Sequence, residues 1–351
     1  MKRTILFIFV LPIWALAQIP PSYYNNLGGL KGQNLLIALH GIIDSHSVIP
    51  YSGLWSAFEK TDAKPNGKVW DIYGYVPSGP QNYEYSFVTM QCGSYSMESD
   101  CFNREHSWPQ SWFNGAVGPD SDLFHIYPSD GFVNNKRSNY PFGTVATPSY
   151  LSLNGSKLGN CGDAGYTGIV FEPVNDIKGD LARSYFYMST RYFTEDLTWS
   201  SSPAANKSTI LPWQLSVLLS WHHIDPVSSK EIARNDSIYY LFQHNRNPFI
   251  DHPEYADSIW AAYVGLDESI LDVKENYAVY PNPTVNGIVH VSGLNDGSKV
   301  EVTNMLGSVV YEGYSSEKIA NIDLSNMPNG VYVLNIKTKF AKHTYKLINA
   351  R

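Results

Sequence analysis

Residues 103–106 read Asn-Arg-Glu-His, and Asn134 opens the polar run 134–139 farther along the chain. A carboxylate beside a histidine, joined by an amide oxygen, suits one hard cation and one general base. Because neighbouring side chains of a strand point to opposite faces, Glu105 and His106 can border one cleft only at an irregular strand end. The run 134–139 is typical of the first turn of a helix or of the loop before it. This stretch therefore predicts a strand end and a helix around a metal and a base.

The composition is that of a folded protein. The chain has 351 residues, of which 43% are hydrophobic and 14% aromatic. This length exceeds one ordinary core, and this composition excludes general disorder. We expect one large domain and a smaller companion.

The N-terminal part of the chain shows both helical and strand patterns. Apolar residues recur at helical spacing in 35–43, 177–192 and 211–219, which predicts three helices with buried apolar faces. The segments 69–73 and 83–88 have the composition of strands. We therefore expect a mainly helical α+β domain over residues 18–264.

The first residues predict export. Lys2 and Arg3 precede an apolar run that ends at Ala15-Leu16-Ala17. This order is that of a signal peptide over 1–17, so the mature chain should begin at Gln18. The run is too short to cross a bilayer, and we expect no membrane span after processing.

Three cysteines fit an exported protein in which one pair is oxidised. Cys92 with Cys101 is the nearest pair, and Cys101 with Cys161 is the alternative. Their spacing matches no structural zinc motif.

The formal charge of −7 argues mildly against a nucleic-acid partner. Binders of nucleic acid usually carry a basic surplus that displaces counterions from phosphates. A bound divalent cation and a few local arginines could supply the positive field instead.

The chain changes character at 265–279, which predicts a linker. Short apolar runs separated by turn signals follow, as expected for a small β-sandwich over 280–351. This tail resembles the C-terminal sorting domain of proteins exported by the type IX secretion system of Bacteroidetes. The residues that carry the likeness are Tyr280-Pro281-Asn282-Pro283, Asn304-Met305-Leu306-Gly307, Met327-Pro328-Asn329-Gly330-Val331-Tyr332 and Lys346-Leu347-Ile348. The resemblance implies contact with that secretion machinery and a secreted or cell-surface location; an adhesive or carbohydrate-binding sandwich is the alternative.

The larger domain resembles the endonuclease I family, secreted or periplasmic bacterial nucleases of the ββα-metal (His-Me finger) type. The matching stretches are Asn103-Arg104-Glu105-His106-Ser107-Trp108-Pro109, Asp122-Leu123-Phe124-His125-Ile126-Tyr127-Pro128-Ser129-Asp130, Val133-Asn134, Arg137-Ser138-Asn139, Phe171-Glu172-Pro173, Lys178-Gly179-Asp180-Leu181-Ala182-Arg183, Trp221-His222, Asp225-Pro226-Val227 and 245–254.

Carried over by position, the resemblance implies that His106 is the general base and that Glu105 and Asn134 hold one Mg²⁺, with Mn²⁺ or Ca²⁺ as alternatives. It implies cleavage of DNA, and of RNA as an open second substrate, with 5′-phosphate products and little sequence preference. We expect a monomer.

Two departures from the family pattern limit the transfer. Phe124 stands where members often have the first histidine of a pair, which weakens the transfer of a role to His125. Some members place a phosphate-binding arginine in a segment that corresponds to 111–121, which here contains no arginine. Arg137 or Arg183 is the expected substitute.

Each site residue also has a structural interpretation. His106 could be a buried, hydrogen-bonded histidine, and Glu105 could pair with Arg104. Asn134 could be a helix cap unless Asn135 supplies it, and Arg183 could pair with Glu172. Two other functions remain open: a zinc hydrolase using His106, His125 and His222, and a non-catalytic surface-binding protein.

Overall fold

The computed structural model describes residues 19–76, 79–264, 277–294, 298–315, 318–337 and 342–350. The predicted signal peptide, its cleavage site before Gln18 and residues 265–276 of the predicted linker lie outside these residues. The chain forms two compact units. Met1–Leu30 and Asn34–Trp260 make up the N-terminal unit, and Lys31–Gln33 and Ala261–Arg351 make up the C-terminal unit.

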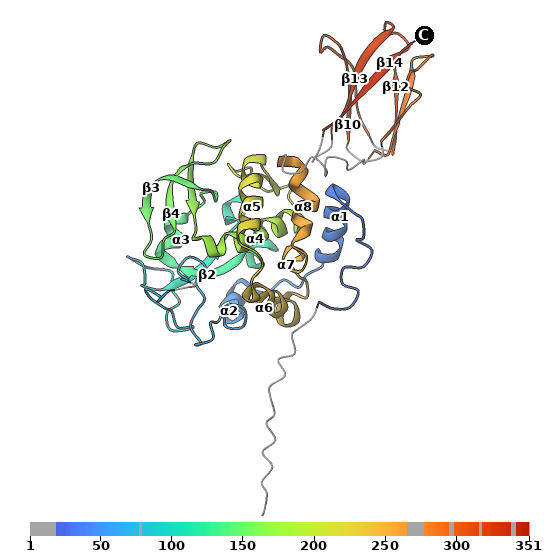
Figure 1. Cartoon of the computed structure of the whole chain (residues 1–351). Coiled ribbons are helices and arrows are strands. Elements are labelled where there is room, and N and C mark those ends of the chain that lie inside the picture. The colour runs from blue at the N-terminus through green and yellow to red at the C-terminus, as the bar shows by residue number, and fades with distance from the viewer. Residues whose placement is uncertain are drawn as a thin grey trace, which may run out of the picture. The chain divides into compact units, whose positions relative to one another are not determined.

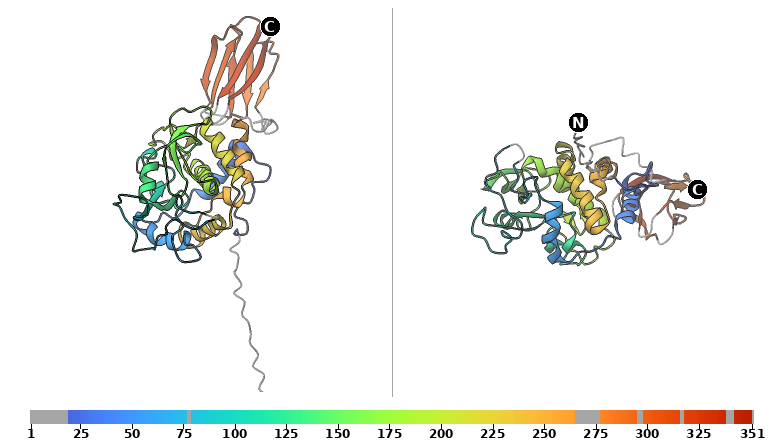
Figure 2. Two further views of the ribbon diagram at one scale, coloured as in Figure 1. Left: turned by 60° about the vertical axis from the view of Figure 1, so that its left-hand side comes forward. Right: turned by 90° about the horizontal axis from the view of Figure 1, so that it is seen from below.

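The N-terminal unit is built around a buried helix, α4, that packs against α5 (Figure 1). All residues of α4 are buried, and the views of Figure 2 also show it between the β-strands on one side and α7 and α8 on the other. The predicted helices at 35–43, 177–192 and 211–219 are confirmed as α1, α4 and α5. The helices are α1 (Gly32–Ile43), α2 (Leu54–Thr61), α3 (Gly131–Arg137), α4 (Lys178–Arg191), α5 (Pro212–Ile224), α6 (Ser229–Ile238), α7 (Pro248–Asp251) and α8 (Glu254–Trp260).

Local sequence explains where two of these helices begin. Pro212 is the first residue of α5, a position whose N–H needs no helical partner. Ser228 and Glu231 form a capping box at the start of α6, each side chain accepting from the other's backbone N–H.

The strands of the N-terminal unit form small antiparallel sheets. β1 pairs with β2, β4 lies between β3 and β5, and β6 pairs with β7. The strands are β1 (Phe102–His106), β2 (Ile126–Asp130), β3 (Val145–Leu151), β4 (Lys157–Cys161), β5 (Ile169–Glu172), β6 (Ala205–Asn206) and β7 (Thr209–Ile210). Helices and strands together confirm the α+β class.

The predicted strands at 69–73 and 83–88 are wrong. One backbone hydrogen bond, from Val69 N to Tyr85 O at 3.0 Å, joins the two segments, but neither forms a strand. Asp71 diverts the first segment into a turn, because its carboxylate accepts from the backbone N–H of Tyr73 at 2.9 Å. The same carboxylate accepts from Asp130 N at 3.0 Å and so ties this turn to the end of β2.

The C-terminal unit is a β-sandwich, as predicted. One sheet has the strand order β11-β10-β13-β14 and the other β12-β9-β8. Side chains from both sheets, among them Val291, Val302 and Leu334, form one buried cluster. Tyr277 belongs to this cluster and β8 begins at Ala278, slightly before the predicted start at 280. The strands are β8 (Ala278–Tyr280), β9 (Ile288–Ser292), β10 (Lys299–Asn304), β11 (Val309–Tyr314), β12 (Ile319–Asp323), β13 (Gly330–Lys337) and β14 (Lys342–Asn349).

Cys92 and Cys101 form a disulfide, and Cys161 is a free thiol. This settles the choice between the two predicted pairings. The bridge lies immediately before β1 and ties the preceding loop to the strand that carries Glu105 and His106.

Candidate active site

The predicted site lies on a strand–strand–helix element formed by β1, β2 and α3. β1 ends at His106, and β2 runs antiparallel to it and leads directly into α3. The Asp130 carboxylate caps α3 by accepting from two backbone N–H groups of its first turn, at 2.8 and 3.0 Å. The predicted strand end and following helix are therefore present, but β1 pairs with β2 in a regular register as far as His106↔Ile126, without the expected irregularity.

Glu105 is buried, with 2% of its surface exposed. Its Oε1 accepts from the Tyr73 hydroxyl at 2.6 Å and from Arg137 Nη1 at 2.8 Å. Its Oε2 has no hydrogen-bond partner among the described residues. Burial raises the pKa of Glu105, and the Arg137 charge and the Tyr73 hydrogen bond oppose that shift. One oxygen is thus fixed by the protein, and the other remains available.

His106 is held in one orientation by its neighbours. Its Nε2 lies 3.2 Å from the carbonyl oxygen of Asp120, and its ring stacks on Tyr51 with centroids 5.9 Å apart. A carbonyl only accepts, so Nε2 carries the proton and Nδ1 presents a lone pair. In the described part of the chain Nδ1 has no hydrogen-bond partner. Burial, and then the nearby His125, lower the pKa of His106 to about 3, so the ring is neutral at pH 7.

Asn134 lies in the fourth position of α3, beyond the cap. Its Nδ2 donates to Asn103 Oδ1 at 2.7 Å and to Arg104 O at 3.4 Å, which fixes the amide so that Oδ1 points elsewhere. That oxygen has no partner among the residues described. Neither Asn134 nor Asn135 caps the helix, because Asp130 already does.

Arg137 supports the strand end from within the protein. It is 1% exposed, and besides Glu105 it donates to the carbonyl oxygens of His106, at 2.7 Å, and Ser107. The proposed pair between Glu105 and Arg104 is wrong, since Arg137 occupies that place. Its buried position also argues against the predicted contact of Arg137 with substrate.

Arg183 is fully buried in a separate network. Its guanidinium makes two hydrogen bonds to the Glu231 carboxylate, at 2.6 and 2.9 Å, and one to the carbonyl oxygen of Asp225 at 3.0 Å. Glu172, its expected partner, pairs with Lys178 at 2.8 Å instead. None of these partners contacts His106, so the predicted catalytic role of Arg183 has no geometric support.

The histidines proposed for zinc do not assemble. His222 donates to Pro253 O at 3.0 Å and faces Arg183 at 3.3 Å, whereas Nε2 of His125 bonds Pro119 O at 2.6 Å. Within the described ranges no group of three or more His, Cys, Asp or Glu side chains is arranged to hold a metal. The zinc alternative therefore loses its ligand set.

Three contacts of this site could not be read from the sequence. Tyr73 and Tyr51 come from aromatic-rich stretches with no distinguishing pattern, and Asp120 acts through its backbone oxygen. Each lies far from its partner in sequence, and no local signal marks it.

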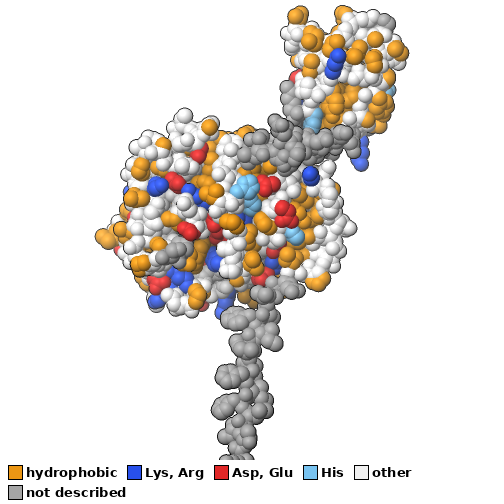
Figure 3. Space-filling view, in the orientation of Figure 1, with side chains coloured by type: hydrophobic (Ala, Val, Ile, Leu, Met, Phe, Trp, Pro, Cys, Tyr) orange, Lys and Arg blue, Asp and Glu red, His pale blue; other side chains and the backbone are white. Residues whose placement is uncertain are grey.

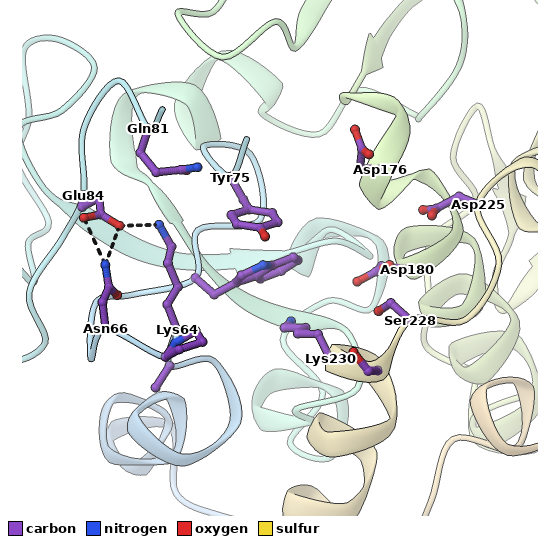
Figure 4. Close-up of a pocket in the computed structure, with 14 residues that line it drawn as sticks. Lys64, Asn66, Tyr75, Gln81, Glu84, Asp176, Asp180, Asp225, Ser228 and Lys230 are labelled. Atoms are coloured by element: carbon purple, nitrogen blue, oxygen red, sulfur yellow. Dashed lines mark hydrogen bonds and ion pairs between the residues drawn. The ribbon is translucent and has the colours of Figure 1, made fainter. Parts of the chain in front are cut away.

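A cavity of about 720 Å³ lies elsewhere on the N-terminal unit (Figure 4). None of the predicted site residues lines it. Lys64 bonds Glu84 at 3.0 Å, and Lys230 lies over the Trp70 ring at 3.3 Å and bonds Asp62 at 3.1 Å. Its cationic groups are therefore already engaged by the protein.

The buried His222 predicts a loss of stability in acid. Burial, and then Arg183, lower the pKa of His222 from its usual value of 6.5 to about 4. The neutral ring is favoured in the folded state, so the full contribution is present above pH 6.5 and is lost as the pH falls toward 4. Between pH 7.5 and 5.0 the cost is about 2 kcal/mol. The tryptophans of the described residues all lie in the N-terminal unit, so urea unfolding followed by tryptophan fluorescence measures this effect.

The comparison variant is His222→Gln, which cannot gain a proton. We expect it to lose less free energy of unfolding than the wild type over that pH interval, whatever its own stability at pH 7.5. Parallel pH profiles for the two proteins would contradict the assignment.

Comparison with known proteins agrees with this architecture. Residues 31–254 match the family model of Endonuclease I, and residues 278–350 match that of the secretion system C-terminal sorting domain. The extracellular ribonuclease of Bacillus amyloliquefaciens is 38% identical over 248 residues, 68% of this chain and 78% of that protein. The extracellular ribonuclease of Bacillus subtilis is 37% identical over 245 residues, again 68% and 78%. The extracellular deoxyribonuclease of Aeromonas hydrophila is 24% identical over 252 residues, 68% of this chain and 94% of that protein.

The two matched regions define a nucleic-acid hydrolase that is secreted or held at the cell surface and carries a C-terminal sorting domain. The chain belongs to the endonuclease I family. No helix among the residues that the structure describes has the length and apolar character of a membrane span.

Proposed function

We propose that this nuclease hydrolyses DNA and RNA phosphodiester bonds with His106 as general base and one Mg²⁺ held by Glu105 and Asn134. The observation that carries the proposal is the tautomer of His106. Because Nε2–H is committed to the Asp120 carbonyl, Nδ1 is a free base on a ring that is neutral at pH 7.

The residues present fit a divalent cation. Glu105 Oε2 and Asn134 Oδ1 are each left without a partner among the described residues, while the other polar atoms of both side chains are held. One carboxylate and one amide oxygen are hard ligands of the kind that Mg²⁺ accepts, and Mn²⁺ or Ca²⁺ can use them as well. When bound, such an ion neutralises charge on the phosphate and stabilises the leaving oxygen. On this proposal β1, β2 and α3 constitute a ββα-metal motif.

The chemistry then follows from the base. His106 Nδ1 takes a proton from water as that water attacks phosphorus, and the P–O3′ bond breaks. The phosphate stays on the 5′ side, and the 3′ oxygen leaves with a proton from solvent. The Asp120 carbonyl stabilises the imidazolium formed on His106 through the Nε2–H bond.

Several observations support a broad substrate range. Attack by water needs no 2′-hydroxyl, so DNA and RNA are equally suitable. The relatives include proteins named as extracellular ribonucleases and one named as an extracellular deoxyribonuclease. On the face shown in Figure 3, basic and acidic side chains are interspersed over the N-terminal unit, an arrangement typical of weak contact without base reading. We also propose that the sorting domain engages the type IX secretion machinery and that the enzyme acts as a monomer.

Removal of the metal should abolish this activity. We expect the mature protein to nick and then linearise supercoiled plasmid and to degrade a single-stranded RNA in Mg²⁺, and EDTA to stop both reactions until Mg²⁺ is restored. The product ends should carry a 5′-phosphate and a 3′-hydroxyl. End-group analysis of a labelled RNA decides this point, because a 2′,3′-cyclic phosphate would show attack by the ribose and contradict the proposed mechanism. Full digestion in EDTA would contradict the metal.

A further inference from the structure

The proposed hydrolysis leaves one requirement without a residue. The phosphate gains negative charge as water adds. One divalent ion held by Glu105 and Asn134 would neutralise only part of that charge. Arg137 and Arg183 are buried in ion pairs with Glu105 and Glu231. A cation that remains accessible must therefore come from elsewhere.

Arg104 lies on the same face of the β1–β2 hairpin as His106. It lies two residues before His106 in β1, so both side chains leave the strand on the same face. The two side chains share a neighbour: the Arg104 guanidinium carbon lies 3.8 Å from the centre of the Tyr51 ring, and that ring stacks on His106. Tyr51 therefore contacts both the Arg104 guanidinium and the His106 ring.

The Arg104 guanidinium is held in place, but two of its nitrogen atoms make no hydrogen bond with the described residues. Its guanidinium carbon also lies 4.5 Å from the centre of the Trp55 ring, and its Nη1 donates to Tyr51 O at 3.1 Å. Within the described residues Arg104 forms no ion pair, and its Nε and Nη2 make no hydrogen bond. The side chain is half-buried, so these N–H groups are not enclosed. Two ring contacts and one hydrogen bond thereby orient the Arg104 guanidinium, while its Nε–H and Nη2–H groups make no hydrogen bond with the described residues.

This arrangement differs from that of a structural arginine. Buried arginines of this unit each meet a carboxylate, as Arg137 meets Glu105 and Arg234 meets Asp62 at 2.9 Å. Among the described residues Arg104 has two aromatic contacts and one carbonyl partner but no ion pair, and the Asp120 carboxylate acts on its charge only at longer range. A guanidinium without an ion pair, on the same face of the strand as His106, is suited to a phosphate oxygen.

We propose that Arg104 binds a non-bridging oxygen of the scissile phosphate and stabilises its charge in the transition state. This inference rests on the proposed function and adds the residue that neutralises charge on the phosphate oxygen. The guanidinium donates through Nε and Nη2, and no bond to it forms or breaks.

The test separates charge from shape. Arg104→Met keeps an apolar stem over Tyr51 and Trp55 without the charge, and Arg104→Lys keeps the charge without the planar fork. With plasmid DNA and saturating Mg²⁺ we expect Met to lower kcat by about 10²- to 10³-fold and Lys by about tenfold, with a much smaller change in KM. Lys60→Gln, an exposed charge removed from α2, is the control and should retain kcat.

The outcomes are distinguishable. Equal losses of kcat for Met and Lys would show a stacking role, and a loss confined to KM with a weaker salt dependence would show contact with a flanking phosphate; either overturns the proposal. If fluorescence shows that the Met variant is unfolded, Arg104→Gln takes its place. Wild type and His106→Ala are measured in the same assay. An inactive wild type would refute the proposed function, whereas an active wild type with a normal Met variant refutes only the role of Arg104.

Discussion

Replacement of His106 by alanine should lower the rate of DNA cleavage by about 10²- to 10⁴-fold at pH 7.5. The reason is the loss of the free Nδ1, since the Asp120 carbonyl that orients the ring cannot act as a base itself. The side chain makes one hydrogen bond, so the fold should persist. Single-turnover cleavage in saturating Mg²⁺ measures the chemical step, and the urea midpoint from tryptophan fluorescence reports on folding.

His223→Ala is the matched control. That histidine is on the same unit, but its side chain is 49% exposed and pairs with Asp257 at 2.9 Å. We expect it to retain wild-type activity. If His106→Ala stays within tenfold of wild type while fully folded, another group is the base.

Replacement of Arg137 by methionine should lower the free energy of unfolding of the N-terminal unit by about 3 to 5 kcal/mol. The change leaves the Glu105 carboxylate buried without its counter-charge and removes the donors to the carbonyl oxygens of His106 and Ser107. Urea unfolding followed by tryptophan fluorescence reports on this unit. We expect activity to fall as well, because the strand end that carries Glu105 and His106 loses its support.

A double variant tests the cause of that instability. Combining Arg137→Met with Glu105→Gln removes both charges, so part of the loss should be recovered through a coupling of about 0.5 to 3 kcal/mol. Lys157→Met is the surface control: Lys157 pairs with Glu172 at 3.3 Å but is 40% exposed, so its loss should cost less than about 1 kcal/mol. Simple additivity of the two buried changes would contradict an ion pair between Glu105 and Arg137.

Several elements could be predicted because their signals are local. The helices α1, α4 and α5 follow from apolar periodicity, and the C-terminal sandwich follows from short apolar runs between turns. The strand end at His106 was also predicted, although β1 pairs with β2 in a regular register up to that residue. The strand prediction failed at 69–73. There the Asp71 carboxylate accepts hydrogen bonds from the backbone N–H groups of Tyr73 and Asp130, so a turn forms in place of strand pairing. A side chain that competes for backbone donors is invisible to periodicity.

For the candidate site, too, some features could be predicted from the sequence and others only from the tertiary structure. The residue types of 103–106 and Asn134 determined the candidate base and ligands, and the order of matching stretches determined the family. The pairing of charges was decided only by tertiary structure: Glu105 meets Arg137 rather than its neighbour Arg104, and Arg183 meets Glu231 rather than Glu172.

The sequence by itself therefore determined the nuclease family, the C-terminal sorting domain and the periodic elements of both units. The tertiary structure decided which nitrogen of His106 is free, since the carbonyl of Asp120, in the segment between β1 and β2, lies against Nε2 of the ring. It also decided that Arg104, among the arginines the structure describes, forms no ion pair. The physical reason is that hydrogen bonds and ion pairs act over a few ångströms in space, and the partners of these groups come from positions far apart along the chain.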